Sequence, residues 1–328
     1  MNRAKVLIAE QLPNLEDDVK ILSSYAEVKI SPSTSEEVLC REIVDVDLLL
    51  VVYVKVNSRI IDSAPKLKGI VRFGIGIDNI DVQIATSRKV LVVNIPDYAI
   101  DTVAEHAFAL LISLARKITV ADRVMRTKKW GNWTSPSKLY LGIDLKGKTL
   151  GIVGMGRIGR SLARKAEAFG MNLLAFDPYL EQEQLDDIKV KLTGLEILLK
   201  ESDFVSIHAP HTPETRGLIG ENQLRIMKKT AYIINTSRGP LIDEKALMKA
   251  LKKKWICGAG LDVYEKEPPA LNNQLLKLEN VILTPHIAWY TEEASKRLEK
   301  LAIQRTVELL QGKIPKTVVN PEVLKQKT

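Results

Sequence analysis

Short runs of aliphatic residues alternate with amphipathic stretches along almost the whole chain. Most runs are rich in β-branched or other aliphatic residues and are closely followed by Gly, Pro, Asp or Asn, which is typical of strands. Continuous apolar strands that alternate with helices indicate parallel sheets covered on both faces. The expected strands are Lys5–Ala9, Glu27–Ile30, Asp47–Val52, Ile70–Phe73 and Val90–Asn94, then Thr149–Val153, Asn172–Phe176, Phe204–Ile207, Tyr232–Asn235, Gly258–Leu261 and Val281–Leu283.

The strands fall into two groups, and the chain of 328 residues is long enough for about two domains. We therefore expect an α/β protein built from two flavodoxin/Rossmann-like doubly wound parallel-sheet domains with a cleft between them. The helical pattern over Thr291–Gln311 can carry the chain back to the first domain. One discontinuous domain would hold residues 1–99 and 288–328, and residues 100–287 would form the other.

The stretch between the two groups predicts a helix and an arm. Thr102 and Glu105 fit a capping box, which marks a helix start. The following segment, 106–118, is apolar on nearly every face, so we expect a helix buried between layers, with His106 as a core histidine. The aromatic segment Trp130–Trp133 is interpreted as an arm that contacts another subunit, which predicts a homodimer.

Composition and charge exclude several classes of protein. The net charge is +8, but the lysines are dispersed, and the run Lys252–Lys254 ends a helical pattern, where cations complement the helix dipole. We therefore expect no nucleic-acid partner. No apolar run is long enough for a membrane span or a signal peptide. Cys40 and Cys257 lack metal-ligand spacing, so we expect no metal site and a cytoplasmic location.

A glycine-rich loop after the strand Thr149–Val153 predicts a dinucleotide site. Gly154 permits the turn, Gly156 lets the backbone approach the pyrophosphate, and Gly159 allows close helix–strand packing. The following helix presents unpaired N–H groups to phosphates. Asp177 ends the next strand, where its carboxylate can accept from the ribose hydroxyls and repel a 2′-phosphate, so we expect NAD rather than NADP. An ordinary glycine turn without a ligand is the alternative. Residues 100–287 are therefore expected to form the NAD-binding domain, and residues 1–99 with 288–328 the substrate-binding domain.

Three later segments place polar residues just beyond expected strands. They are 235–243, which begins Asn-Thr-Ser-Arg-Gly-Pro, 258–268, which ends Glu-Lys-Glu-Pro, and 283–288, which reads Leu-Thr-Pro-His-Ile-Ala. In open α/β sheets, ligands bind at this edge. A histidine can exchange a hydroxyl proton near neutral pH, a carboxylate can fix its tautomer, and an arginine can grip a substrate carboxylate. The candidate residues are Arg238, His286, and either Glu265 or Glu267; each also has a purely structural alternative.

From about residue 50 to about residue 310, the chain resembles the D-isomer-specific 2-hydroxyacid dehydrogenase family. The resemblance implies that Arg238 orients the substrate, that His286 is the acid/base and that Glu267, which precedes a proline, is its carboxylate partner. It also implies that Asp262 faces the nicotinamide. For His208, a structural role is an equal alternative to cofactor contact. The other implied cofactor-side residues are Arg157, Ile158, His208, Ala209, Pro210, Thr215, Thr236, Ser237 and Ala288.

The substrate is expected to be a small anionic 2-hydroxy or 2-keto acid. Backbone N–H groups at Gly74, Ile75 and Gly76 can bind its carboxylate, although a plain turn is the alternative. Lys55 and Arg72 match positions that phosphoglycerate dehydrogenases use for anionic groups, which predicts a D-3-phosphoglycerate dehydrogenase-like enzyme. The segment 51–53 reads Val-Val-Tyr where those enzymes carry an arginine, so a glyoxylate/hydroxypyruvate reductase is the alternative. An NAD-sensing corepressor-like binding protein is the alternative from another class.

Overall fold

The computed structural model describes residues 3–10, 15–127 and 138–325. The chain divides into two compact units, residues 1–99 with 291–328 (unit 1) and residues 100–290 (unit 2). The second boundary lies at Thr291 and not at the expected residue 288. Ile287 and Ala288 stay with unit 2 because their backbone amides donate to the carboxylate of Asp262. The assignment of substrate to one unit and NAD to the other remains a prediction.

Unit 1 is built on a five-stranded parallel sheet in the order β2-β1-β3-β4-β5, which is the flavodoxin-like order. Its apolar core includes Leu7, Leu49 and Ile70 from three adjacent strands. The strands are β1 (Lys5–Ile8), β2 (Glu27–Ile30), β3 (Leu48–Val51), β4 (Gly69–Arg72) and β5 (Leu91–Val93). The helices are α1 (Leu15–Leu22), α2 (Glu36–Glu42), α3 (Ser58–Asp62), α4 (Val82–Ser87), α11 (Glu292–Leu310) and α12 (Glu322–Lys325).

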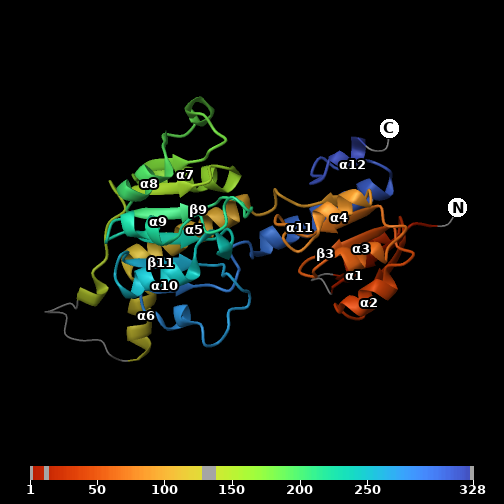
Figure 1. The fold of residues 1–328 in the computed structure, drawn as a ribbon, viewed down its shortest axis with the longest axis horizontal. Helices are drawn as coiled ribbons and strands as arrows, with labels where there is room; N and C mark the ends of the chain where they lie inside the picture. The colour runs from red at the N-terminus through yellow and green to blue at the C-terminus, as the bar shows by residue number, and fades with distance from the viewer. Residues whose placement is uncertain (1–2, 11–14, 128–137, 326–328) are drawn as a thin grey trace. The chain divides into compact units, whose positions relative to one another are not determined.

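Unit 2 is built on a seven-stranded parallel sheet in the order β12-β11-β10-β9-β6-β7-β8; two of its strands, β9 and β11, are labelled in Figure 1. Counted from β6, this is the Rossmann order with one further strand. The strands are β6 (Thr149–Val153), β7 (Asn172–Phe176), β8 (Lys191–Leu192), β9 (Phe204–Ile207), β10 (Tyr232–Asn235), β11 (Gly258–Leu261) and β12 (Val281–Leu283).

Helices cover both faces of this sheet, so the chain alternates strand and helix as the sequence predicts. Buried residues of α5 and α7 form one apolar cluster with the sheet, and residues of α8, α9 and α10 form the other. The helices are α5 (Ile100–Arg116), α6 (Ile118–Arg126), α7 (Arg157–Ala168), α8 (Leu195–Glu201), α9 (Glu221–Ile226) and α10 (Glu244–Lys252), with short 3₁₀ turns η1 (Lys138–Tyr140), η2 (Gln182–Leu185), η3 (Gly239–Leu241) and η4 (Gln274–Lys277).

The two-domain α/β prediction is confirmed, with local corrections. The two-residue strand β8 is absent from the predicted set. The predicted capping box is wrong, because α5 begins at Ile100 and Thr102 lies buried inside it. The start of α5 is instead tied to α7, where Ser161 donates to the carboxylate of Asp101 (2.5 Å). The expected arm at 130–133 lies outside the described residues. None of the described helices is long and apolar enough to span a membrane.

The C-terminal segment extends the sheet of unit 1 at β5. Val318 forms an antiparallel bridge with Val93. The buried side chain of Asn320 accepts from the Val92 amide (2.8 Å) and donates to the Val90 carbonyl (2.9 Å). One amide side chain therefore satisfies backbone groups that this sheet edge would otherwise leave unpaired.

We expect Asn320→Ala to lower the free energy of unfolding by about 1–3 kcal/mol, because it leaves a buried N–H and a buried C=O unpaired. Urea unfolding followed by circular dichroism measures this loss. Lys316→Ala is the matched control, since Lys316 is an exposed residue of the same segment. Coincident unfolding curves for the two variants would contradict the expectation.

Candidate active site

The candidate functional residues of unit 2 follow the carboxyl ends of its parallel strands. Gly154 follows β6, Asp177 follows β7, and His208 follows β9. Two further segments, 236–238 and 284–288, follow β10 and β12. Because all these strands run in parallel, their ends meet along one edge of the sheet. The order of the strands reverses between β6 and β9, which is where open α/β sheets bind ligands.

The three glycines of the loop differ in whether backbone conformation or packing requires a glycine at their position. Gly154 has φ +92°, and a Cβ there would lie 2.5 Å from the Ala209 amide nitrogen. A Cβ on Gly159 would lie 2.3 Å from the Gly154 carbonyl oxygen. Gly156 has an ordinary φ of −70°, and a Cβ there would meet nothing within 4 Å. Neither the backbone nor packing requires a glycine at position 156, so the open space in front of it is available to a ligand.

The carboxylate of Asp177 holds the glycine loop in place. One oxygen accepts from the Met155 amide (2.9 Å), and the other accepts from the Tyr179 amide (3.1 Å). The carboxylate therefore has a fixed position beside the start of α7. Its predicted contact with the ribose remains a prediction.

The loop after β9 is held by hydroxyl groups from the predicted cofactor set. Ser237 donates to the Ala209 carbonyl (2.6 Å) and Thr215 donates to the Pro210 carbonyl (2.7 Å). Burial lowers the pKa of His208 to about 4, so this histidine is neutral at physiological pH and pairs with Ser206 (2.8 Å). Thr236 differs, because its buried hydroxyl has no partner within the described residues.

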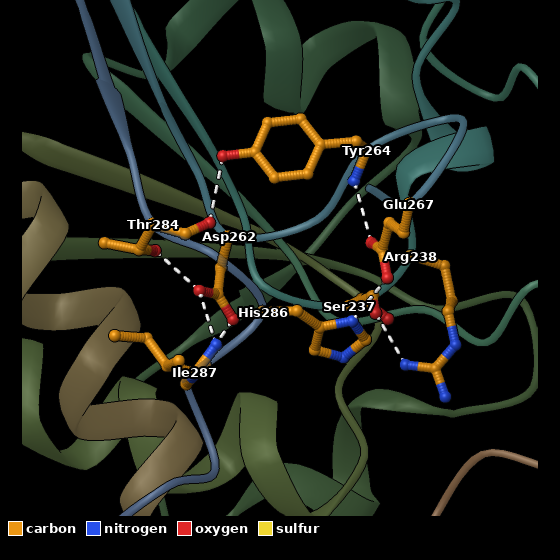
Figure 2. A network of polar contacts seen from close by, with 9 residues as sticks. Ser237, Arg238, Asp262, Tyr264, Glu267, Thr284, His286 and Ile287 are labelled. Atoms are coloured by element: carbon orange, nitrogen blue, oxygen red, sulfur yellow. Dashed lines mark hydrogen bonds and ion pairs between the residues drawn. The ribbon is translucent and has the colours of Figure 1, made fainter. Parts of the chain in front are cut away.

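His286 and Glu267 form a hydrogen-bonded pair at this edge. His286 Nδ1 lies 2.6 Å from Glu267 Oε2, and the Tyr264 amide donates to Glu267 Oε1 (3.0 Å) (Figure 2). The two side chains are 38% and 36% exposed. The competing candidate, Glu265, is an exposed residue that pairs with Arg216 (3.4 Å). The structure thus pairs the histidine with Glu267.

The electrostatics of this pair assign the histidine tautomer. Burial alone would raise the pKa of Glu267, but the hydrogen bonds from His286 and Tyr264 and the charges of His286 and Arg238 hold that pKa below its usual range. The carboxylate is therefore ionised and can only accept. Nδ1 of His286 consequently carries the hydrogen, and Nε2 remains as the atom that can exchange a proton.

Arg238 leaves β10 through a local turn. Its carbonyl accepts from Asn235 Nδ2 (2.8 Å), and its guanidinium Nη1 donates to the Ser237 carbonyl (2.7 Å). A Cβ at the next residue, Gly239, would lie 1.9 Å from the Tyr264 backbone. The turn therefore packs against the segment that carries Glu267, and the charge of Arg238 acts on that carboxylate. The structure brings the three predicted catalytic residues together.

Asp262 has a role that the sequence analysis missed. Its side chain has no solvent-exposed surface. Its backbone carbonyl accepts from the His286 amide (2.8 Å), and its carboxylate accepts from the Ile287 (2.9 Å) and Ala288 (2.8 Å) amides. These bonds hold His286 at φ +56°, a left-handed conformation that non-glycine residues rarely adopt. Asp262 therefore shapes the segment that aims His286, while its contact with the nicotinamide remains a prediction.

Two further residues tie down the same segment and were also missed. Thr284 Oγ1 lies 2.5 Å from Asp262 Oδ1, and the Tyr264 hydroxyl donates to the Thr284 carbonyl (2.9 Å). Burial, together with the charges of nearby carboxylates, raises the pKa of Tyr264 to about 12, so the hydroxyl keeps its hydrogen. The order Thr-Pro-His after a strand was visible in the sequence, but nothing local indicated the partners of Thr284.

The predicted substrate residues Lys55, Arg72, Gly74, Ile75 and Gly76 all lie in unit 1. Lys55 is exposed. The guanidinium of Arg72 donates to the Phe73 carbonyl (2.9 Å) and occupies the space where a Cβ of Gly74 would lie. The Ile75 carbonyl accepts from Asn94 Nδ2 (2.7 Å), so this loop is held by its own neighbours.

A carboxylate of the chain occupies the amides that follow β3. Glu10 accepts from the amides of Val52, Tyr53 (2.8 Å) and Val54 (2.7 Å). Asn79 Nδ2 donates to the Val54 carbonyl (2.8 Å) of the same segment. These three successive amides would otherwise form an anion-binding nest. Because Glu10 fills it, this segment offers an anionic ligand no free amide at those positions.

Among the described residues, no group of three or more His, Cys, Asp or Glu side chains is arranged to hold a metal ion. The candidate site consists of a glycine loop with open space in front of Gly156, the His286–Glu267 pair and the guanidinium of Arg238. This combination can bind an anionic dinucleotide and exchange a proton beside it.

Comparisons with known proteins agree with this geometry. Residues 108–288 match the family described as D-isomer specific 2-hydroxyacid dehydrogenase, NAD binding domain. A glyoxylate reductase from Thermococcus litoralis is 42% identical over 330 residues, which cover 98% of each chain. A D-3-phosphoglycerate dehydrogenase from Methanocaldococcus jannaschii is also 42% identical, but the match covers 98% of this chain and only 61% of that protein.

The similarity extends to solved structures. The crystal structure of a glyoxylate reductase from Paecilomyes thermophila superposes with a TM-score of 0.89 at 32% identity, covering 98% of this chain and all of that one. The architecture is thus shared with a dehydrogenase of known structure.

We expect Gly156→Val to raise the Kd for NADH by at least about tenfold. Because Gly156 is the N-cap of α7, where Val is less favourable than Gly, the thermal unfolding midpoint should fall slightly, and less than in Gly159→Ala. The added side chain enters space that is empty in the protein alone and that a pyrophosphate would need. Titration of NADH fluorescence and a thermal melt measure the two quantities.

Gly159→Ala is the matched comparison, because its Cβ would collide with the Gly154 carbonyl and should lower the unfolding midpoint. Unchanged NADH affinity in Gly156→Val would remove this loop as the pyrophosphate site.

Proposed function

The chain belongs to the D-isomer specific 2-hydroxyacid dehydrogenase family, and on that premise we propose that it reduces glyoxylate with NADH as the hydride donor. It is an NAD-dependent dehydrogenase acting on 2-hydroxy and 2-keto acids. The observation that carries the proposal is the 2.6 Å His286–Glu267 pair beside Arg238. The glyoxylate reductase of Thermococcus litoralis, which matches this chain end to end, supports glyoxylate as the acid.

The residues of unit 2 supply what the reaction needs apart from the hydride. NADH, when bound, supplies that hydride to the carbonyl carbon. Nε2 of protonated His286 gives its proton to the carbonyl oxygen as the C–H bond forms, so glyoxylate becomes glycolate. The carboxylate of Glu267 stabilises the positive charge of the imidazolium before transfer. Arg238 presents its guanidinium to the substrate carboxylate and fixes the carbonyl for attack.

The site fits a dinucleotide on structural grounds. The open space at Gly156 and the N-terminus of α7 suit the pyrophosphate. The Thr236 hydroxyl, which has no hydrogen-bond partner in the described part of the chain, is available to a polar group of the cofactor. The Asp177 carboxylate would accept from a ribose hydroxyl and repel a 2′-phosphate, so we propose NAD rather than NADP as the working cofactor.

Phosphohydroxypyruvate and 3-phosphoglycerate are the second candidate substrate pair. Lys55 and Arg72 favour them, as does the phosphoglycerate dehydrogenase from Methanocaldococcus jannaschii. Two observations weigh against them. Segment 51–53 has no arginine, and Arg72 already bonds to its own loop. We therefore place the phosphorylated acid second, with hydroxypyruvate as a further substrate of the first activity.

A homodimer and a cytoplasmic location also remain proposals. A corepressor-like binding protein that senses NAD is the alternative from another class. The complete histidine–glutamate pair beside an arginine favours an enzyme, because partner recruitment needs no proton-exchanging atom at the dinucleotide site.

We expect kcat/KM for glyoxylate to exceed that for phosphohydroxypyruvate by at least about tenfold, since nothing in the 51–54 segment compensates a second anionic group. NADH consumption at 340 nm, measured with glyoxylate, hydroxypyruvate, phosphohydroxypyruvate and pyruvate, gives the ranking. The same assay with NADPH tests the role of Asp177. A higher kcat/KM for the phosphorylated acid would reverse the proposed order of substrates.

We expect His286→Ala to lower kcat for glyoxylate reduction on the order of 10²- to 10⁴-fold, because the carbonyl oxygen loses its proton donor. NADH binding should be unchanged, which a fluorescence titration measures. Glu265→Gln is the matched control, since Glu265 is a nearby carboxylate outside the pair. Near-normal kcat in His286→Ala would refute the assigned role.

A further inference from the structure

His106 on α5 is the start of a chain of polar contacts that ends at His286. Its Nε2 lies 3.0 Å from Thr284 Oγ1 and 3.6 Å from Asp262 Oδ1. Thr284 Oγ1 lies 2.5 Å from the same carboxylate oxygen. The sequence analysis places His106 in the apolar core, but its side chain is 21% exposed and contacts a polar network.

The direction of each hydrogen bond in this chain can be assigned. Both oxygens of Asp262 accept amide hydrogens from the segment after His286. The hydroxyl of Thr284 therefore donates its hydrogen to Oδ1, and its oxygen is left as an acceptor. Nε2 of His106 consequently carries a hydrogen and donates it to Thr284. We call the chain of contacts from His106 through Thr284 to Asp262 the relay. Only one assignment of hydrogens lets each of its groups bond to its neighbours.

We propose that His106 is a positioning residue for the dehydrogenase reaction. It orients the Thr284 hydroxyl, which braces the Asp262 carboxylate, and that carboxylate holds the amides that keep His286 at φ +56°. The inference rests on the proposed role of His286 as the proton donor. Small displacements of a catalytic group lower the rate steeply, by about 100-fold for 1 Å. A residue three contacts away can thus control kcat without touching substrate or cofactor.

The charged and titratable residues beside the relay do not provide a second polar connection between His106 and the His286 segment. Tyr264 donates to the Thr284 carbonyl, not to its hydroxyl. Glu105, the neighbour of His106 on α5, is exposed and lies 3.9 Å from Lys165. The contact between α5 and the His286 segment therefore runs through Thr284 and Asp262.

The decisive experiment compares His106→Phe, which keeps an aromatic ring but removes the donor, with His106→Gln, whose amide restores a donor. With glyoxylate and NADH, we expect His106→Phe to lower kcat roughly tenfold to 100-fold, while KM for NADH changes less than about twofold. His106→Gln should recover most of kcat. Glu105→Gln is the matched control and should keep the wild-type kcat.

A double-mutant cycle tests whether the effect passes through Thr284. If it does, adding His106→Phe to Thr284→Val should cost no further activity, because the relay is already broken. If the two losses multiply, His106 acts by another route and the proposal is wrong. Wild-type kcat in His106→Phe, or no recovery in His106→Gln, would also overturn it.

A readout without substrate separates this inference from the proposed function. Amide hydrogen exchange at Ile287 and Ala288 reports the bonds to Asp262 directly. We expect His106→Phe to speed exchange there at least about tenfold, with no change in Glu105→Gln. If His286→Ala keeps full activity while exchange responds as expected, the proposed function fails and the positioning contact stands. Unchanged exchange in His106→Phe overturns the positioning role whatever the activity shows.

Discussion

Asp262 is fully buried, yet it binds three consecutive backbone amides, those of residues 286–288. A buried carboxylate is costly unless donors surround it, and here the donors are the segment that must be shaped. The same hydrogen bonds therefore stabilise the buried carboxylate and fix the conformation of the segment that follows β12. The backbone carbonyl of Asp262 accepts from the His286 amide, and its carboxylate accepts from the next two amides. Asp262 as a whole therefore holds the left-handed backbone of the histidine, and that backbone sets the direction of the side chain.

The parallel sheet makes this contact possible. β11 and β12 are neighbours in register, so the residues that follow them, Asp262 and the 284–288 segment, start side by side. β10 lies on the other side of β11 and delivers Arg238 to the same edge. Three segments that are far apart in the sequence therefore meet without a long connection. The polar groups differ between members of such folds, but the edge that collects them is a property of the sheet.

The sequence predicted most of the architecture and the catalytic pair. Continuous aliphatic runs identified the major strands, because a strand buried on both faces must be apolar throughout. The resemblance to the family, in which the partner glutamate precedes a proline, selected Glu267 over Glu265. The sequence did not predict β8, because a strand of two residues is too short to show a hydrophobic pattern. The capping box at Thr102 failed because packing against α7 favoured an earlier helix start. Thr284, Tyr264 and His106 were missed as partners because each acts through contacts that are distant in sequence.

Residue types and their order therefore determined the fold class and the glycine loop, since these depend on short-range patterns. The tertiary structure alone decided how the histidine is aimed. The carboxylate that shapes its backbone, the hydroxyl that braces the carboxylate, and the helix that supplies His106 come from three separate parts of the chain. Unit 1 contains a similar long-range contact, in which the carboxylate of Glu10 accepts from the backbone amides of residues 52–54. A hydrogen bond needs a partner within about 3 Å, and for residues far apart in sequence only the folded chain sets that distance.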